Sequence, residues 1–204
     1  ERRASMILIE TMTRQAAMKK LSAAACVIFM FPTVSLLYSA ELPRPAYTVF
    51  EELDVKIPMR DGIRLSTNIY RPKEPGKYPA LLCRTPYGNG GAGNKQAHFF
   101  AARGYVYMAQ DTRGSYESEG IFYPLFNETA DGLDTHSWIV KQPWSNGKIG
   151  GFGGSYVGMT QWLPAIAGSP HLVSMFPLVP YTENYTVSFQ NGAFRMRMFT
   201  TWYT

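Results

Sequence analysis

The sequence predicts an α/β protein built on a mostly parallel sheet that opens with an antiparallel hairpin. From Ala80 onward, apolar runs with strand character alternate with segments of helical periodicity. This alternation is typical of parallel strands that helices cover on both faces. Before Ala80, two runs of alternating hydrophobicity flank a short Arg-Asp-Gly turn, which indicates a hairpin. The 204 residues are enough for one domain with a sizeable core.

The first half of the sheet follows from hydrophobic patterning. Residues 55–59 and 63–70 are the two hairpin strands around the turn at 60–62. The apolar run "ALLCRTPYG" predicts a strand that ends at Pro86, and "NKQAHFFAARG" predicts a short helix that Gly104 closes. The run "YVYMAQDTRG" is polar only at its end, so we expect a second buried strand there.

The second half repeats this alternation. Residues 127–142 have helical periodicity, with Leu133, Trp138 and Ile139 on one side. We then expect a strand at "KIGGFGG", a helix at "SYVGMTQWLPAIAG" and a further buried strand at "HLVSMFPLVP". After Pro180 the composition becomes aromatic, methionine-rich and polar, which indicates the start of an insertion or a second domain.

The N-terminal forty residues resemble a targeting segment. Met18 is followed by two lysines, an apolar run that Pro32 interrupts, and small residues that end at Ala40. This layout is typical of a secretory signal peptide. A membrane anchor is the rival interpretation, although the broken run is short for a span of about 20 apolar residues. We therefore expect residues 1–17 to be over-extended or fragmentary sequence and residues 18–40 to be a signal peptide. The mature protein would be periplasmic or extracellular and detached from the membrane.

Charge and cysteine content argue against several classes of function. The net charge is +5, but much of it lies in the first twenty residues, and no basic stripe with interleaved aromatics follows. We therefore predict no nucleic-acid partner. Only Cys83 remains once the leader is removed, so we expect a buried core cysteine and no disulfide. Three histidines lack the spacing of metal ligands, so we predict neither a metal nor a cofactor. These histidines are His98, His136 and His171.

The clearest candidate for chemistry is Ser155 in "GKIGGFGGSYVGMTQW". A serine between a glycine-rich strand and a helix can occupy a strained turn, with Gly153 and Gly158 giving room where strand and helix meet. The helix N-terminus would stabilise negative charge, and the backbone N–H of Tyr156 would face a reacting oxyanion. The generic spacing G-x-S-x-G is not met, because residue 157 is valine. An ordinary corner with serine as N-cap therefore stays open.

Polar residues end two of the predicted strands. Tyr87 follows the first of them, at the edge of a parallel sheet where ligands gather, and its phenol could donate to an oxyanion. Taken alone, a tyrosine that packs against a turn is the favoured interpretation. Asp111 and Arg113 end the next strand, and we expect them to form an ion pair that shapes the loop. A catalytic acid at Asp111 is the alternative.

A second motif supports a different class of protein. Gly88, Gly90 and Gly93 fit the spacing G-x-G-x-x-G after a strand, and Asp111 lies near the position of a ribose-binding acid. The alternative is therefore a dinucleotide-dependent oxidoreductase. Two observations count against it, since a hairpin precedes the motif and the helix begins late, after "NK".

Four segments occur in order with matching gaps: "VKIPMRDGIRLSTNIYRP", "CRTPYG", "AARGYVYMAQDTRGSYESEG" and "DGLDTHSWIVKQPWSNGKIGGFGGSYVGMTQW". Together they resemble the α/β-hydrolases related to cocaine esterase (the CocE/NonD family), to α-amino-acid ester hydrolases and to Xaa-Pro dipeptidyl-peptidases. The resemblance extends over about residues 49–180. That family's turn reads G-x-S-Y-x-G, which residues 153–158 match.

The resemblance implies an α/β-hydrolase fold and a serine hydrolase that acts on small-molecule esters or amides. Ser155 would be the nucleophile, and the backbone N–H of Tyr156 and the side chain of Tyr87 would be the oxyanion donors. An acyl-enzyme would form and water would release it. Aminoacyl, aromatic acyl and Xaa-Pro substrates all stay open. Residues 41–180 would be the N-terminal part of the catalytic domain, and residues 181–204 the start of a helical cap insertion.

The catalytic partners of the serine are the open question. In α/β-hydrolases the acid and then the histidine follow the nucleophile. After Ser155 the chain offers only Glu183 and His171, both too early, and His136 precedes the serine in a helix where we expect it to be partly exposed. We therefore expect the acid, the histidine, the rest of the cap and a C-terminal jelly-roll domain to lie beyond Thr204. This chain alone would be inactive. A non-catalytic remnant is an alternative, and a homo-oligomer is compatible with the sequence.

Overall fold

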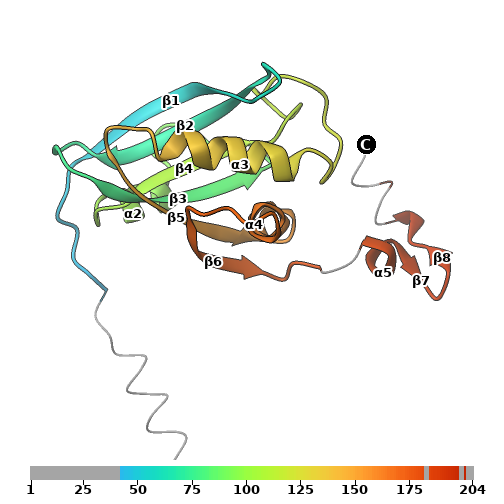
Figure 1. Cartoon of the computed structure of the whole chain (residues 1–204). Coiled ribbons are helices and arrows are strands. Elements are labelled where there is room, and N and C mark those ends of the chain that lie inside the picture. The colour runs from blue at the N-terminus through green and yellow to red at the C-terminus, as the bar shows by residue number, and fades with distance from the viewer. Residues whose placement is uncertain (1–41, 182–183, 198–199, 201–204) are drawn as a thin grey trace, which may run out of the picture. The chain divides into compact units, whose positions relative to one another are not determined.

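A six-stranded sheet forms the centre of the computed structural model, which describes residues 42–181, 184–197 and 200. The strand order is β1-β2-β4-β3-β5-β6, with β3, β4, β5 and β6 parallel to one another (Figure 1). The predicted leader at 18–40 and the segment 1–17 lie outside the described residues. The strands of this sheet are β1 (Val49–Pro58), β2 (Arg64–Pro72), β3 (Tyr78–Thr85), β4 (Val106–Asp111), β5 (Ser145–Gly154) and β6 (Leu172–Leu178).

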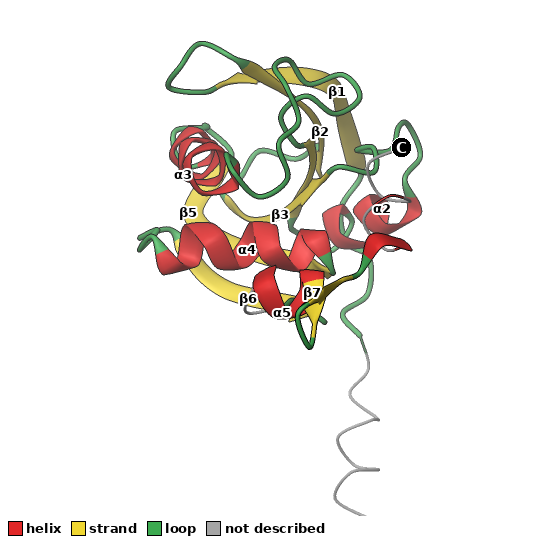
Figure 2. Ribbon diagram, turned by 90° about the vertical axis from the view of Figure 1, so that its right-hand side faces the viewer, coloured by secondary structure: helices red, strands yellow, loops and turns green. Residues whose placement is uncertain are grey.

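The opening hairpin is antiparallel, as predicted. The Met59 N–H donates to the Ile63 carbonyl at 2.8 Å, and Gly62 has a φ of 87°, which glycine adopts without steric cost. In the register that follows, Ile57 faces Leu65, and both side chains are buried. Strand β2 also pairs antiparallel with β4, which joins the hairpin to the parallel strands. Figure 2 shows the resulting twisted sheet, with β1 and β6 at its two ends.

Helices cover the two faces of the sheet. Helix α2 (Lys95–Ala101) begins where the Asn94 side chain accepts from two backbone N–H groups, and its Ala97 and Ala101 pack against tyrosines of β2 and β4. Helices α3 (Glu128–Ile139) and α4 (Tyr156–Ile166) lie on the other face. In Figure 1, α3 runs in front of the strands and α4 is seen end-on. The core beneath α3 consists of aliphatic and other apolar residues, including Ile57, Leu65, Ile69, Leu82, Val106, Met108, Ile139 and Ile149.

The strands differ in burial according to their place in the sheet. All six residues of β4 are buried, as expected for a central strand with helices on both faces. We predicted a further buried strand at β6, and this is wrong. Strand β6 is an edge strand whose residues are exposed or half-buried, because no described helix covers the face of β6 on the side of α2. Cys83 is half-buried and packs against the cluster around α2, where burial raises the pKa of its thiol.

The last described residues form short elements of their own. These are α5 (Asn184–Ser188) and the two-stranded ladder of β7 (Phe189–Gln190) and β8 (Ala193–Phe194). Their assignment to a helical cap stays a prediction. Among the residues that the structure describes, no helix combines the length and the apolar character needed to cross a membrane.

Candidate active site

Ser155 occupies a strained turn between β5 and α4. Its φ of 54° and ψ of −121° lie in a region that costs a non-glycine residue about 1–3 kcal/mol. Two backbone hydrogen bonds hold it there: the Ser155 N–H donates to Leu178 O at 2.9 Å, and the Gly158 N–H donates to Ser155 O at 2.9 Å. Ser155 is exposed and its side chain makes no capping hydrogen bond to α4. The interpretation as an ordinary N-cap serine is therefore wrong, since the hydroxyl does not bond the helix.

Close packing explains the glycines around this serine. A Cβ on Gly153, whose φ is 137°, would lie 2.3 Å from Val157 Cγ1. A Cβ on Gly158 would lie 3.3 Å from the carbonyl oxygen of Leu178 on β6. Val157 thus fills the space above Gly153, and Gly158 is the residue that passes close to β6.

Tyr87 lies at the same edge of the sheet as Ser155. Strands β3 and β5 are parallel neighbours, with Leu82 opposite Gly151, so their carboxyl ends meet at one edge. The Tyr87 N–H donates to Thr85 Oγ1 at 3.0 Å, and the residue is 51% exposed just beyond the end of β3. The first residue of α4 is Tyr156, so its N–H belongs to the helix end that follows Ser155. The topology thus brings all three predicted site residues to one edge.

The glycine-rich loop before α2 is occupied by contacts within the protein. The Asn94 side chain caps the first N–H groups of α2, and the Gly93 N–H faces the carboxylate of Glu51 at 3.2 and 3.3 Å. The hydroxyl of Tyr70 donates to the carbonyl of Gly91 at 2.6 Å. A pyrophosphate needs free N–H groups and a positive environment at such a position. These contacts, with an acidic side chain among them, argue against the dinucleotide alternative.

Arg113 does not pair with Asp111, so that prediction is wrong. Its guanidinium binds Asp131 at 2.6 and 3.0 Å and Asp61 at 2.6 Å, because the loop after β4 turns toward the hairpin and α3. Asp111 is 1% exposed. Its Oδ1 has no hydrogen-bond partner among the described residues. Burial raises the pKa of Asp111 to about 6.

Two of the three histidines have side-chain partners on elements other than the turn of Ser155. His98 lies 2.5 Å from Glu51 on the α2 face. The backbone carbonyl of His171, directly before β6, accepts from the Ile149 N–H of β5. His136 is 3% exposed, so the prediction of a partly exposed residue is wrong. Its Nδ1 lies 2.8 Å from Ser169 Oγ, and burial lowers its pKa to about 4. Glu183 lies outside the described residues.

Two residues near this site were not predicted from the sequence. Arg84 on β3 and Glu128 at the start of α3 form a buried ion pair, with Arg84 Nη2 2.9 Å from Glu128 Oε2 and side chains only 1% and 3% exposed. The other carboxylate oxygen, Oε1, accepts from the hydroxyl of Tyr156 at 2.7 Å. A charged residue inside the apolar run "ALLCRTPYG" was a signal for Arg84. Nothing local pointed to its partner, which is 44 positions away in sequence.

Comparisons with known proteins show the family and the fold of this chain. The family model for X-Pro dipeptidyl-peptidase (S15 family) matches residues 61–204. The cocaine esterase of Rhodococcus sp. (strain MB1 Bresler) is 40% identical over 137 residues, which cover 65% of this chain and 24% of that protein. A CocE/NonD family hydrolase from Staphylococcus aureus has a similar structure, with a TM-score of 0.64 and 30% identity over 69% of this chain and 30% of that one.

An α-amino acid ester hydrolase structure is also similar. Its TM-score is 0.67 and its identity 31%, over 80% of this chain and 31% of that one. The chain thus spans about a quarter to a third of the length of these relatives. The family model covers more than half of the chain, and the relatives share its mostly parallel sheet. The chain therefore belongs to the X-Pro dipeptidyl-peptidase (S15) family and has the α/β-hydrolase fold of CocE/NonD hydrolases.

Proposed function

We propose that the protein containing this chain is a serine hydrolase that cleaves ester or amide bonds through an acyl-enzyme on Ser155. One observation carries the proposal. Ser155 is exposed at the carboxyl edge of the sheet, in a backbone conformation that costs energy, and its hydroxyl does not cap the helix that follows. Such strain is kept where a nucleophile must project from a strand-to-helix turn.

The roles of the other residues follow from this attack. As Ser155 Oγ bonds to the carbonyl carbon, the carbonyl oxygen becomes an oxyanion. The backbone N–H of Tyr156 and the hydroxyl of Tyr87 would donate hydrogen bonds to it. The N-terminal end of α4 adds a favourable dipole. Collapse of the tetrahedral intermediate releases the alcohol or amine and leaves the acyl-enzyme, and water then releases the acid.

The base that accepts the serine proton would come from outside this chain. The side chains of His98 and His136 contact Glu51 and Ser169, and His171 directly precedes β6, at the edge of the sheet opposite to the carboxyl ends of the strands. The relatives are three to four times longer than the matched region, which leaves room for an acid and a histidine elsewhere in the natural protein. We therefore expect no ester turnover from the 204-residue chain alone.

A fluorophosphonate probe tests the proposal on the full-length protein. Wild type should be labelled at Ser155, and Ser155→Ala should lose labelling and lose activity by a factor on the order of 10⁶. Tyr87→Phe should lower kcat by about 10²–10³ with little change in KM, because it removes one oxyanion donor. Tyr123→Phe, an exposed tyrosine, is the matched control. Labelling at a residue other than Ser155 would contradict the proposal.

The substrate class follows from the family at the level of esters and amides. Acyl, aminoacyl and Xaa-Pro substrates are separated by comparing kcat/KM for a p-nitrophenyl ester, an amino-acid ester and an Xaa-Pro p-nitroanilide. Preference for the anilide would make the protein a dipeptidyl-peptidase, and preference for an ester would make it an esterase.

We further propose that the protein is exported with removal of residues 18–40. The lysine pair, the apolar run and the small residues at its end support this proposal. Amino-terminal sequencing of the protein from the periplasm or the medium should begin near residue 41. Cytoplasmic protein that retains these residues would contradict export.

A further inference from the structure

We propose that Glu128 is a positioning residue whose buried carboxylate sets the relative position of the two oxyanion donors. The inference rests on the proposed function. It concerns how Tyr156, on α4, and Tyr87, beyond β3, keep a fixed relative position although they belong to different elements.

One side of the carboxylate holds the serine turn. Glu128 Oε1 accepts from the Tyr156 hydroxyl at 2.7 Å, and the same hydroxyl accepts from the Leu125 N–H at 2.9 Å. The phenol therefore donates once and accepts once, which fixes its direction. Burial, with the nearby carboxylate, raises the pKa of Tyr156, so the phenol remains a proton donor at working pH. The side chain thus anchors the residue whose backbone N–H follows Ser155.

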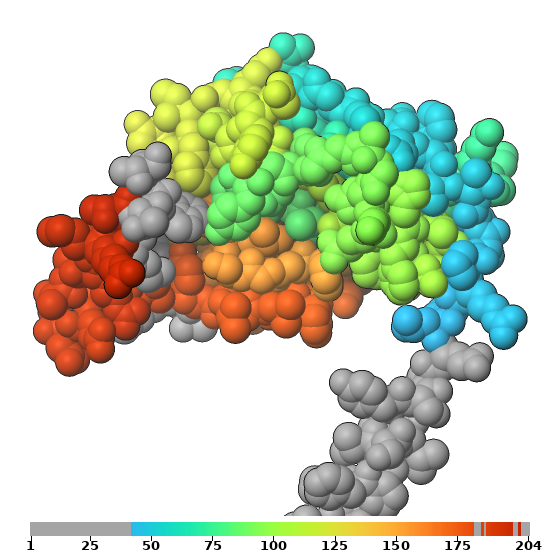
Figure 3. Space-filling view, turned by 180° about the vertical axis from the view of Figure 1, so that it is seen from behind, coloured from blue at the N-terminus to red at the C-terminus, as the bar shows by residue number. Residues whose placement is uncertain are grey.

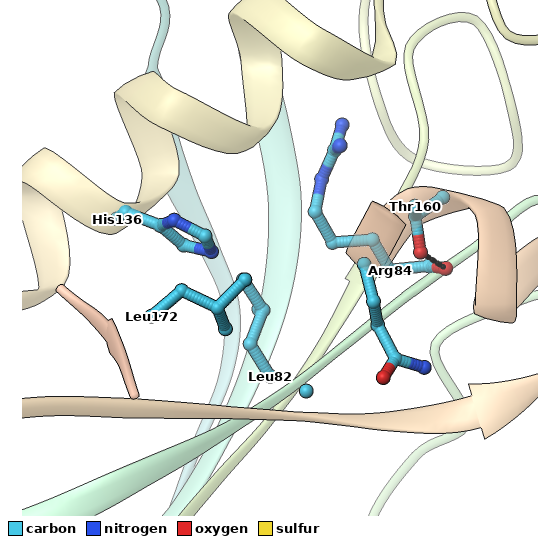
Figure 4. A pocket seen from close by; sticks show the side chains of 7 residues that line it. Leu82, Arg84, His136, Thr160 and Leu172 are labelled. Carbon is cyan, nitrogen blue, oxygen red and sulfur yellow. Dashed lines mark hydrogen bonds between the residues drawn. The ribbon is translucent and has the colours of Figure 1, made fainter. Parts of the chain in front are cut away.

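The other side holds the end of β3. Glu128 Oε2 lies 2.9 Å from Arg84 Nη2 at an angle outside hydrogen-bond geometry, and the Glu128 carbonyl accepts from Arg84 Nη1 at 2.9 Å. Arg84 is three positions before Tyr87. Its own carbonyl accepts from Thr160 Oγ1 of α4 at 3.1 Å (Figure 4). Figure 4 also shows the guanidinium extending away from its strand toward α3.

A wider set of buried groups fixes this arrangement. Arg84 Nε donates to Gln110 Oε1 at 2.7 Å, and Arg84 Nη2 lies 3.9 Å from Asp131. Asp131 in turn binds Arg113. Buried polar groups that are paired in this way rigidify their surroundings, while an unpaired member is costly. Glu128 is the member that contacts both donor-bearing segments directly.

A positioning role can be distinguished by experiment from a purely structural role of the same contacts. The two roles differ in what they predict for the transition state. A structural role changes the amount of folded enzyme, whereas a positioning role changes the stabilisation of the oxyanion in each folded molecule. A second difference is coupling. If Glu128 aligns two donors with each other, loss of that alignment matters less once one donor is already absent.

The test uses the full-length enzyme, with active sites titrated by a fluorophosphonate. Tyr156→Phe removes one hydroxyl and leaves the ion pair in place. We expect kcat to fall about tenfold with KM within about twofold, a smaller loss than that of a whole donor. Affinity for a boronic acid, which forms a tetrahedral adduct on the serine, should fall by the same factor as kcat. Tyr123→Phe should change neither quantity.

The decisive measurement is the double variant Tyr156→Phe/Tyr87→Phe. We expect its loss in kcat/KM to be close to that of Tyr87→Phe alone, and not the product of the two single losses. If Tyr156→Phe does not fold, Glu128→Gln takes its place and is compared alone and in combination with Tyr87→Phe. If the loss of the double variant equals the product of the two single losses, the positioning role is overturned and the proposed function is not. The same holds if the Tyr156→Phe enzyme keeps wild-type kcat and boronate affinity. A wild-type enzyme that does not react at Ser155 overturns the proposed function instead.

Discussion

At the scale of single residues, Asp111 and His136 have pKa values displaced in opposite directions over the same pH range. Burial raises the pKa of Asp111 from 3.8 to about 6, so its favourable contribution to folding is full below pH 3.8 and is lost as the pH rises to about 6. Burial, helped by Arg84 and His171, lowers the pKa of His136 from 6.5 to about 4. Its contribution is full above pH 6.5 and is lost as the pH falls to about 4.

Each displacement of a pKa corresponds to about 3 kcal/mol of unfolding free energy. Between pH 4 and 7 the two contributions change with opposite sign, so their sum is nearly independent of pH. Single variants should expose them. Between pH 7 and pH 4, Asp111→Asn should lose about 3 kcal/mol of unfolding free energy relative to wild type, and His136→Asn should gain a similar amount. Asparagine can replace Nδ1 of His136 in its contact with Ser169. Urea unfolding at four pH values measures the unfolding free energy of both variants. If this free energy depends on pH in both variants as it does in wild type, the displaced pKa values of Asp111 and His136 are contradicted.

At the scale of elements, the turn between β5 and α4 depends on one glycine more than on its neighbours. Gly153→Ala would place a methyl group 2.3 Å from Val157 Cγ1, whereas the same change at Gly147 meets nothing within 4 Å. Both glycines have positive φ, of 137° and 82°, so both changes add backbone strain, and only the change at residue 153 also adds steric overlap. Gly147→Ala should cost about 1 kcal/mol.

Gly153→Ala should cost several times more, because Val157 belongs to the helix itself and has no space to move into. It should also displace Ser155. Thermal unfolding and the rate of fluorophosphonate labelling, compared for the two variants, measure these effects. Equal melting temperatures and equal labelling rates would show that the turn tolerates a side chain at residue 153.

The elements themselves were largely predictable, because hairpin and helix signals are local. The hairpin turn, the Asn94-led helix and the strand before Ser155 all follow from residues within a few positions of one another. Contacts between distant segments were not. Arg113 binds Asp61, 52 positions away, and not its neighbour Asp111. Burial of His136 likewise depends on how α3 lies against the loop after α4, which periodicity alone does not specify.

At the scale of the whole molecule, the part of the sheet face beside α2 that β3, β5 and β6 form is apolar and is not covered by any described helix. A groove of about 280 Å³ runs over β3, β5 and β6 on the side of α2, lined in part by Leu81, Phe152 and Phe176. Phe152 stacks on Phe176 with ring centroids 6.0 Å apart, and both belong to strands of a parallel sheet, which normally has both faces covered. Figure 3 shows this side, with the orange residues of β5 and β6 at the surface beside α2.

An open apolar surface of this kind promotes association between molecules. The 204-residue chain alone should therefore bind a hydrophobic dye and self-associate, and Phe176→Ser should weaken both by making the centre of the groove polar. Ile166→Ser is the control, because Ile166 is also exposed, at 78%, but lies on α4 at the opposite face. Dye fluorescence and sedimentation velocity measure the two effects. If Ile166→Ser reduces them as much as Phe176→Ser does, the groove is not the surface through which this chain associates.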